Sequence, residues 1–274
     1  MLTPRILRCA ASLSLAGVLL LLALLTSSPG SADRYPLPAL LTPTAPPASI
    51  TYTVYLPLIE RHVWVPAPLQ NGSFEGGYSY WRNPSGTVQN AISVPDNWVF
   101  FWDPSYNDPE VVKPPEMRII RSVPPYVSPP RVDSGTQALM WFCFFHDSDV
   151  GVYQQVPAET GHLYRAQGFA HVWYSQRDNP YLSEWKDRDG IWHVILNGDP
   201  GMEVMIGIDP TGGQDPWSED VVWTSKNIYE EYGKVTVQAT AEAPTVTVFI
   251  RARTDDPFKH TDAYWDEVSL EVLH

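Results

Sequence analysis

Apolar and polar residues alternate with a period of two along most of the chain after residue 69. Between Tyr164 and Trp173 the even positions are small or apolar, except for Tyr164, while the odd positions are polar or aromatic. This alternation is typical of strands, and no stretch keeps a helical period over three turns. We expect strands at residues 138–145, 150–156, 164–173, 193–196, 204–208, 235–241, 246–253 and 266–272. Gly- and Pro-rich turns separate them, which favours an antiparallel sandwich or barrel.

The second face of these strands carries unusual residues for a surface in water. A solvated face holds mostly Thr, Ser, Lys and Glu. Here one strand carries Phe169, His171 and Trp173, and another carries Phe249 and Arg251. The run at 138–145 is apolar on both faces. Two alternatives follow: long loops such as residues 83–134 cover this face, or a ligand binds to it.

The N-terminal part has the pattern of an exported protein. Arg5 and Arg8 precede an apolar run at 10–25, and small residues follow up to Ala32. This pattern predicts a secretory signal peptide over residues 1–32, although the apolar run is also near the minimum for an uncleaved membrane anchor. After cleavage we expect no membrane insertion. The protein is then secreted, free in the extracellular medium or associated with the cell surface.

Residues 33–68 are rich in proline and predict an extended spacer. The spacer contains a strand-like run at 50–59, which either adds an edge strand to the domain or docks on a partner. The remaining residues, 69–274, form the predicted folded domain.

Composition narrows the function classes. The formal net charge of −13 argues against nucleic acid as a partner, because phosphate binding needs clustered Lys and Arg. Removal of the signal peptide leaves Cys143 alone, so neither an intramolecular disulfide nor a cysteine zinc site is expected. The motifs of common hydrolases and nucleotide-binding enzymes are missing. The acids at 203, 209 and 215 surround a turn, and turn chemistry explains them better than catalysis.

Four motifs, in this order, resemble those of CenC-like carbohydrate-binding modules. They are L-Q-N-G-S-F-E-G-G at 69–77, P-D-N-W at 95–98, G-V-Y-Q-Q-V at 151–156 followed by G-H-L-Y at 161–164, and A-Y-W-D-E-V-S-L at 263–270. The resemblance covers residues 69–274. It implies an all-β, antiparallel jelly-roll β-sandwich of the galactose-binding-like group.

The resemblance also implies a structural calcium site that joins the first and last strands. Its ligands are then the carboxylates of Glu75 and Asp266, with a backbone carbonyl such as that of Ser73. Ca²⁺ takes about six to eight oxygen ligands, and two carboxylates offset its charge. The alternative is that both acids simply flank apolar strand residues at the surface.

The resemblance finally implies binding of an oligo- or polysaccharide on a concave sheet. Aromatic rings stack on the apolar faces of sugar rings, while polar side chains bond the hydroxyls. The candidate ligand-binding residues are Trp173, His171, Phe169, Arg251, Phe249, Phe142 and, at the rim, Trp98. The segments 98–134 and 174–191 depart from the family pattern, and either could fill the groove.

We therefore expect a secreted, non-catalytic module that binds extracellular glycan. The alternative is a structural or adhesion module that contacts other extracellular proteins. A glycoside hydrolase is the third hypothesis.

Overall fold

The fold was analysed in a computed structural model. It describes residues 63–106, 113–121, 130–177, 184–186, 189–196, 199, 201–254 and 258–274. The predicted signal peptide, most of the spacer and the strand-like run at 50–59 lie outside the described residues. None of the helical structure in the described ranges is long and apolar enough to cross a membrane.

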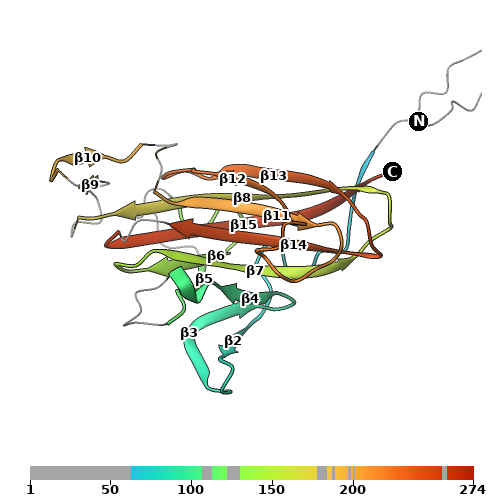
Figure 1. The fold of residues 1–274 in the computed structure, drawn as a ribbon, viewed down its shortest axis with the longest axis horizontal. Helices are drawn as coiled ribbons and strands as arrows, with labels where there is room; N and C mark the ends of the chain where they lie inside the picture. Colours follow the sequence, from blue (N-terminus) through green and yellow to red (C-terminus); the bar gives the residue numbers. More distant parts are fainter. Residues whose placement is uncertain are drawn as a thin grey trace, which may run out of the picture. The chain divides into compact units, whose positions relative to one another are not determined.

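The described strands form two layers (Figure 1). The larger sheet has the order β13-β8-β15-β6-β5-β3-β2, and β1 pairs with β15. Its strands are β1 (Trp64–Pro66), β2 (Tyr78–Arg82), β3 (Val88–Pro95), β5 (Glu116–Arg121), β6 (Gln137–Cys143), β8 (Leu163–Ser175), β13 (Gly233–Thr240) and β15 (His260–Leu273). Among the described pairs of this sheet, only β3 and β5 run parallel.

The smaller sheet has the order β12-β11-β14-β7-β4 and is antiparallel throughout. Its strands are β4 (Val99–Trp102), β7 (Ser148–Pro157), β11 (Glu203–Asp209), β12 (Val222–Lys226) and β14 (Thr245–Thr254). A short separate ribbon pairs β9 (Glu184–Lys186) with β10 (Trp192–Val194). The predicted all-β, antiparallel jelly-roll sandwich is confirmed.

Every run that the alternation predicted as a strand coincides with a strand of the structure. The prediction of a long loop over 83–134 was wrong, because this segment contains β3, β4 and β5. β4 and β5 have four and six residues, and in β3 the polar pair Gln89–Asn90 interrupts the alternation. Apolar and polar residues alternate over too few positions here for periodicity alone to distinguish these strands from turns.

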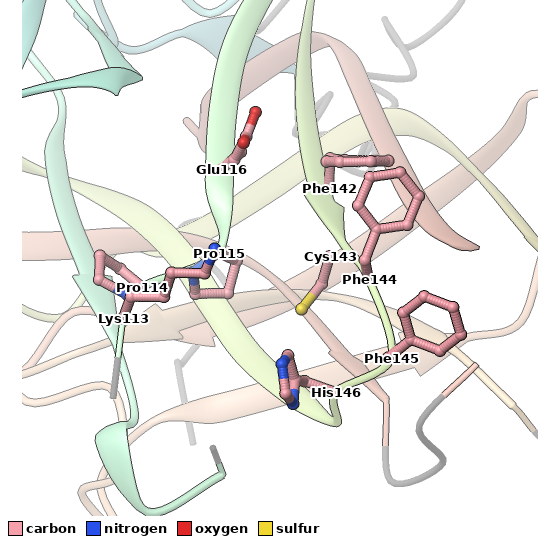
Figure 2. Close-up of a pocket in the computed structure, with 9 residues that line it drawn as sticks. All are labelled: Lys113, Pro114, Pro115, Glu116, Phe142, Cys143, Phe144, Phe145 and His146. Carbon is pink, nitrogen blue, oxygen red and sulfur yellow. The ribbon is translucent and has the colours of Figure 1, made fainter. Parts of the chain in front are cut away.

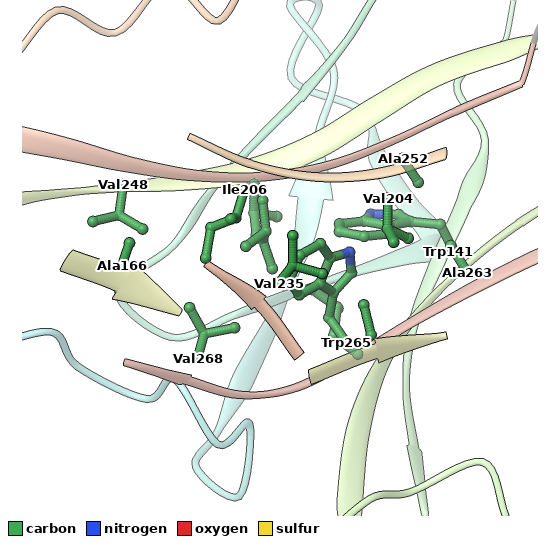
Figure 3. Close-up of a cluster of buried hydrophobic side chains, with 14 of the residues drawn as sticks. Trp141, Ala166, Val204, Ile206, Val235, Val248, Ala252, Ala263, Trp265 and Val268 are labelled. Carbon is green, nitrogen blue, oxygen red and sulfur yellow. The ribbon is translucent and has the colours of Figure 1, made fainter. Parts of the chain in front are cut away.

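The core lies between the two sheets. The even residues of β8 face inward with Trp141 and Trp265 of the same sheet, against residues such as Ile206 and Val248 of the smaller sheet (Figure 3). Both tryptophans are fully buried. Small residues on β8 make room for them: a Cβ added to Gly168 would lie 3.2 Å from the Trp265 ring. The alternation on β8 therefore reflects small residues packing under large ones.

The first and last motifs of the resemblance meet at one point. β15 contains a bulge after Asp266, where Glu267 adopts a positive φ of 50°. The amide of Val268 then donates to the carbonyl of Gly72 over 2.8 Å. A Cβ on Gly72 would lie 1.9 Å from the Val268 carbonyl oxygen, so only glycine fits there.

Candidate functional site

The structure divides the predicted sugar-binding residues between the two sheets. Phe169, His171 and Trp173 lie on β8 of the larger sheet, and Phe249 and Arg251 lie on β14 of the smaller one. In both strands the intervening residues belong to the core. The two sets therefore face away from each other on opposite sides of the sandwich, which corrects the expectation of one shared concave face.

The β8 set is covered by the protein itself. His171 is 0% exposed and Trp173 is 5% exposed. The guanidinium of Arg131 lies 4.9 Å from the Tyr264 ring and 5.7 Å from the Trp173 ring, and it contacts His171 Nε2 over 3.1 Å. Burial and the charge of Arg131 lower the pKa of His171 to about 3, so this imidazole is neutral. Loop cover, rather than an open platform, is what the described residues show here.

Phe169 is half-buried, and the Lys234 ammonium lies 5.4 Å from its ring. Trp98 is a buried residue that contributes to the lining of a hollow beside β2, β3 and β4. It is buried against Phe74, with ring centroids 6.0 Å apart, and its Nε1 donates to the Asn71 carbonyl over 3.1 Å. Asn97 has a positive φ of 71° in the turn just before it.

Phe142 lines a small hollow at the end of β6 (Figure 2). The hollow has a volume of about 250 Å³ and lies between a Pro114–Pro115 wall and the rings of Phe142, Phe144 and Phe145. This volume is below the roughly 300–1,000 Å³ of typical small-molecule sites. Burial raises the pKa of the Cys143 thiol beside it to about 11, which makes this thiol a poor nucleophile at neutral pH.

The two predicted calcium ligands hold the same segment of backbone. Glu75 accepts hydrogen bonds from the Thr136 amide (2.6 Å), the Thr136 hydroxyl (2.6 Å) and the Gln137 amide (2.7 Å). Asp266 accepts from the amides of Asp133 (3.1 Å) and Ser134 (3.0 Å). The two acids therefore fasten residues 133–137 to the turn before β2 and to the last strand, β15.

This arrangement does not fit an ion shared by the two acids. Apart from the Thr136 hydroxyl, the groups that face the Glu75 and Asp266 side-chain oxygens are backbone N–H donors, which do not ligate a cation. Among the described residues no group of three or more His, Cys, Asp or Glu is placed to hold a metal. Ser73 lies half-buried in the turn between Asn71 and Phe74. Calcium binding stays a prediction.

The outer face of the smaller sheet carries a different aromatic cluster. Phe249 lies at its centre, with ring centroids 6.1 Å from Phe101, 5.5 Å from Tyr153 and 5.7 Å from Trp223. Trp217, from the loop after β11, lies edge-on to Phe101 at 5.8 Å. We call these five residues the β14 aromatic face.

Two glycines form the floor of the β14 aromatic face. A Cβ on Gly151 would lie 2.4 Å from the Phe101 ring, and one on Gly207 would lie 2.7 Å from the Trp223 ring. Glycine within a strand often marks such a close approach. The rings therefore lie directly against the backbone of β7 and β11 instead of standing out from the sheet.

The β14 aromatic face has a buried layer and an accessible layer. Phe249 and Phe101 are buried, whereas Tyr153 and Trp223 are half-buried and Trp217 is 45% exposed. This distinguishes it from the β8 set, in which His171 and Trp173 are buried. Aromatic side chains with accessible area and fixed neighbours are what a stacking ligand requires.

Polar groups surround these rings on two sides. Arg251 forms a buried ion pair with Asp149, and its guanidinium lies 5.4 Å from the Trp223 ring. On the other side the Tyr153 hydroxyl donates to Gln214 over 3.0 Å, and the Gln214 amide donates to Gln155 over 2.8 Å. Burial raises the pKa of Tyr153, so the phenol stays protonated and can donate.

The sequence indicated Phe249 and Arg251 but not the accessible members of this face. Tyr153 stood within a motif that was used for the fold, and Trp217 follows the turn residues Asp215 and Pro216. Gly151 and Gly207 were the sequence features that could have located this face, because an isolated glycine in a predicted strand indicates the close approach of another group.

Comparison with known proteins gives only distant similarities. No protein-family model matches the chain, and no curated protein matches it. A carbohydrate-binding module solved with β-1,4-galactotriose, TmCBM61, is 13% identical with a TM-score of 0.42, over 74% of this chain and 97% of that one.

Two further carbohydrate-binding modules have similarly low identities and TM-scores. A CBM4 structure is 17% identical with a TM-score of 0.32, over 65% of this chain and 96% of that one. The CBM22-1 xylan-binding domain of Xyn10C from Paenibacillus barcinonensis is 9% identical with a TM-score of 0.34, over 64% and 85%. At these identities the likeness concerns the fold alone.

Proposed function

We propose that this protein binds saccharide on the β14 aromatic face without catalysing a reaction. The observation that carries the proposal is the position of Trp217, a 45% exposed indole that packs on Phe101. The Phe101 ring also lies 6.4 Å from Tyr153, which is hydrogen-bonded to the Gln155–Gln214 amide pair. Sugar rings present apolar C–H faces to an aromatic ring and hydroxyls to amides and phenols. The predicted signal peptide would bring this face to extracellular glycan.

The buried layer supports binding by fixing the accessible layer in advance. Phe101 packs both against Trp217 and against Phe249, so the indole rests on a ring that is itself buried. The Trp217 Nε1 also donates to Asp149 over 3.4 Å. A ligand that meets fixed side chains avoids the entropic cost of ordering them, about 0.5–1.5 kcal/mol for each side chain.

The two buried carboxyls on this side, Asp149 and Asp209, support binding better than catalysis. Asp149 is engaged by Arg251, and Asp209 accepts hydrogen bonds from the amide and hydroxyl of Thr211 at 2.8 and 2.7 Å. Both aspartates are 1% exposed. Glycoside hydrolysis uses two carboxyls that flank the scissile bond, and neither of these reaches a substrate.

The test is retention of the full chain on insoluble polysaccharides and on a glycan array. We expect wild type to be retained by at least one polysaccharide and Trp217→Ala to lose that retention. Trp192→Ala is the matched control, because Trp192 is an accessible tryptophan on β10 outside the β14 aromatic face. The proposal is overturned if folded Trp217→Ala is retained as well as wild type. It is also overturned if wild type is retained by none of the polysaccharides or glycans.

A further inference from the structure

We infer that the ligand is an extended saccharide chain that continues from the β14 aromatic face, across edge strand β4, into a second hollow beside the β2–β3 hairpin. This inference rests on the proposed function and adds the length of the ligand to it. Three observations carry it: the size of the hollow, the side chains that line it, and its continuity with the β14 aromatic face.

The hollow has the size of a ligand site. Its volume is about 630 Å³, well within the roughly 300–1,000 Å³ of known sites. The hairpin contributes Tyr80, Trp81 and Arg82 to its lining, and β4 contributes Val99 and Phe100. In Figure 1, β2 and β3 extend away from the two layers next to β4.

The lining of the hollow suits a hydroxyl-rich ligand. Tyr80 is 48% exposed, and Trp81 lies edge-on to Phe100 with centroids 5.3 Å apart. The hydroxyls of Ser79 and Tyr80 and the guanidinium of Arg82 supply donors beside these rings. Arg82 is the charged residue of the lining, which contains no acid although the chain carries a net charge of −13. Aromatic faces combined with neutral and cationic donors match the chemistry of sugar rings.

Val99 connects the hollow with the β14 aromatic face. It lines the hollow, is 47% exposed, and pairs with Tyr153 in the β4–β7 register. Directly paired residues of antiparallel strands have Cα atoms about 4.5–5.5 Å apart. One strand spacing therefore separates Tyr153 from the lining of the hollow. A chain laid across the strands reaches both, whereas a single sugar ring reaches one.

Hydrogen bonds within the protein hold the β2–β3 hairpin, which forms one wall of the hollow. The Asp96 amide donates to the Gly77 carbonyl over 2.9 Å, and the Asn71 side chain donates to the Asp96 carbonyl over 3.3 Å. These bonds tie the base of the hairpin to the first motif of the domain. The Arg82 guanidinium donates to the Gly86 carbonyl over 3.1 Å across the hairpin tip.

The experiment is calorimetric titration with oligosaccharides of about two and about six rings, prepared from the polysaccharide that wild type retains. A single aromatic contact contributes about 0.5–1.5 kcal/mol, or up to about tenfold in affinity. We expect wild type to bind the longer ligand more tightly, and Tyr80→Ala to lose up to about tenfold for the longer ligand only. Tyr80→Phe keeps the ring and removes the hydroxyl, so its affinity for the longer ligand shows which of the two groups makes the contact.

Trp192→Ala is the control, because Trp192 is an accessible aromatic residue on β10 that does not line the hollow. We expect it to bind both ligands like wild type, and Trp217→Ala to weaken both. Equal affinity of wild type for both lengths, or unchanged binding of the longer ligand by Tyr80→Ala, would refute the extended ligand. Binding of both ligands by Trp217→Ala at wild-type strength would instead refute the proposed function.

Discussion

Asp262 gives a prediction about stability and pH that tests the structure independently of any ligand. It lies on β15 between Phe142 of β6 and Trp173 of β8. Its Oδ2 accepts the Tyr264 hydroxyl over 2.9 Å, but its Oδ1 is buried without a hydrogen-bond partner. Burial raises the pKa of this carboxyl from 3.8 to about 6, and the Tyr264 hydrogen bond and the charge of Arg131 only partly oppose this rise.

The sign follows from proton linkage. The folded protein holds the Asp262 proton more tightly than the unfolded chain, so the free energy of unfolding falls as the pH rises from about 4 to about 6. Below that window both states are protonated and the penalty is absent. One pKa unit corresponds to about 1.36 kcal/mol, which gives an upper limit of about 3 kcal/mol. Because the whole residue is only half-buried, we expect about 1–2 kcal/mol.

The perturbation is Asp262→Asn, which keeps an acceptor for Tyr264 and removes the ionisation. Urea unfolding, followed by tryptophan fluorescence at several pH values between 4 and 7, measures the effect. We expect Asp262→Asn to gain stability relative to wild type as the pH rises from about 4 to about 6. The difference between the two proteins is the measured quantity, because Asp266, with its pKa raised to about 6, and His171, with its pKa lowered to about 3, change stability with pH in opposite directions in both proteins.

Glu242→Gln is the control, because it removes the same charge at an exposed position. It should follow the wild-type pH dependence. If Asp262→Asn shows the same slope as wild type and Glu242→Gln, Asp262 is not a buried carboxyl with a raised pKa, and the reasoning fails.

Three further predictions concern the two outer faces. Asp149→Ala leaves Arg251 buried without its partner and should lower the free energy of unfolding by about 3–5 kcal/mol in urea titration; a loss below about 1 kcal/mol contradicts a buried ion pair. Gly207→Ala places a methyl group against the Trp223 ring and should shift the tryptophan emission spectrum and weaken glycan retention, whereas an unchanged spectrum contradicts the close contact. A chelator should leave the melting temperature unchanged, because backbone amides already engage Glu75; a lower melting temperature, with calcium found by elemental analysis, would support the predicted calcium site.

The alternation of residues predicted which side chains leave the core but not which sheet they belong to. On β8 and β14 the odd positions lie on the face opposite the core residues, as the period of two requires, although Trp173 near the end of β8 also packs against the main core cluster. The partners of these strands decide the rest: β8 pairs with β13 and β15, and β14 pairs with β7 and β11. Such pairings join residues far apart in the chain, and a period within one strand carries no information about them.

The motifs at the two ends of the domain were informative for a local reason. Gly72 is needed because a Cβ at this position would collide with the Val268 carbonyl, which follows the bulge at Glu267. The resemblance carried by these motifs thus predicted that the two segments meet. It did not predict that the carboxylates of Glu75 and Asp266 would turn toward the amides of residues 133–137. None of the motifs includes that segment, so its course was not predicted.

The two outer faces show why aromatic content alone does not locate a binding surface. Both faces carry rings on alternate strand positions, and both have a cation next to a tryptophan. On the larger sheet the cation is Arg131, from the segment before β6, and it lies over Trp173, which is buried. On the smaller sheet the cation is Arg251, which belongs to β14 itself. It forms an ion pair with Asp149 of the neighbouring strand β7. A cation held within the sheet leaves space above the rings, whereas a cation brought in by a loop occupies that space. The difference lies in the origin of the charged residue, and it favours the β14 aromatic face as the place where a ligand can bind.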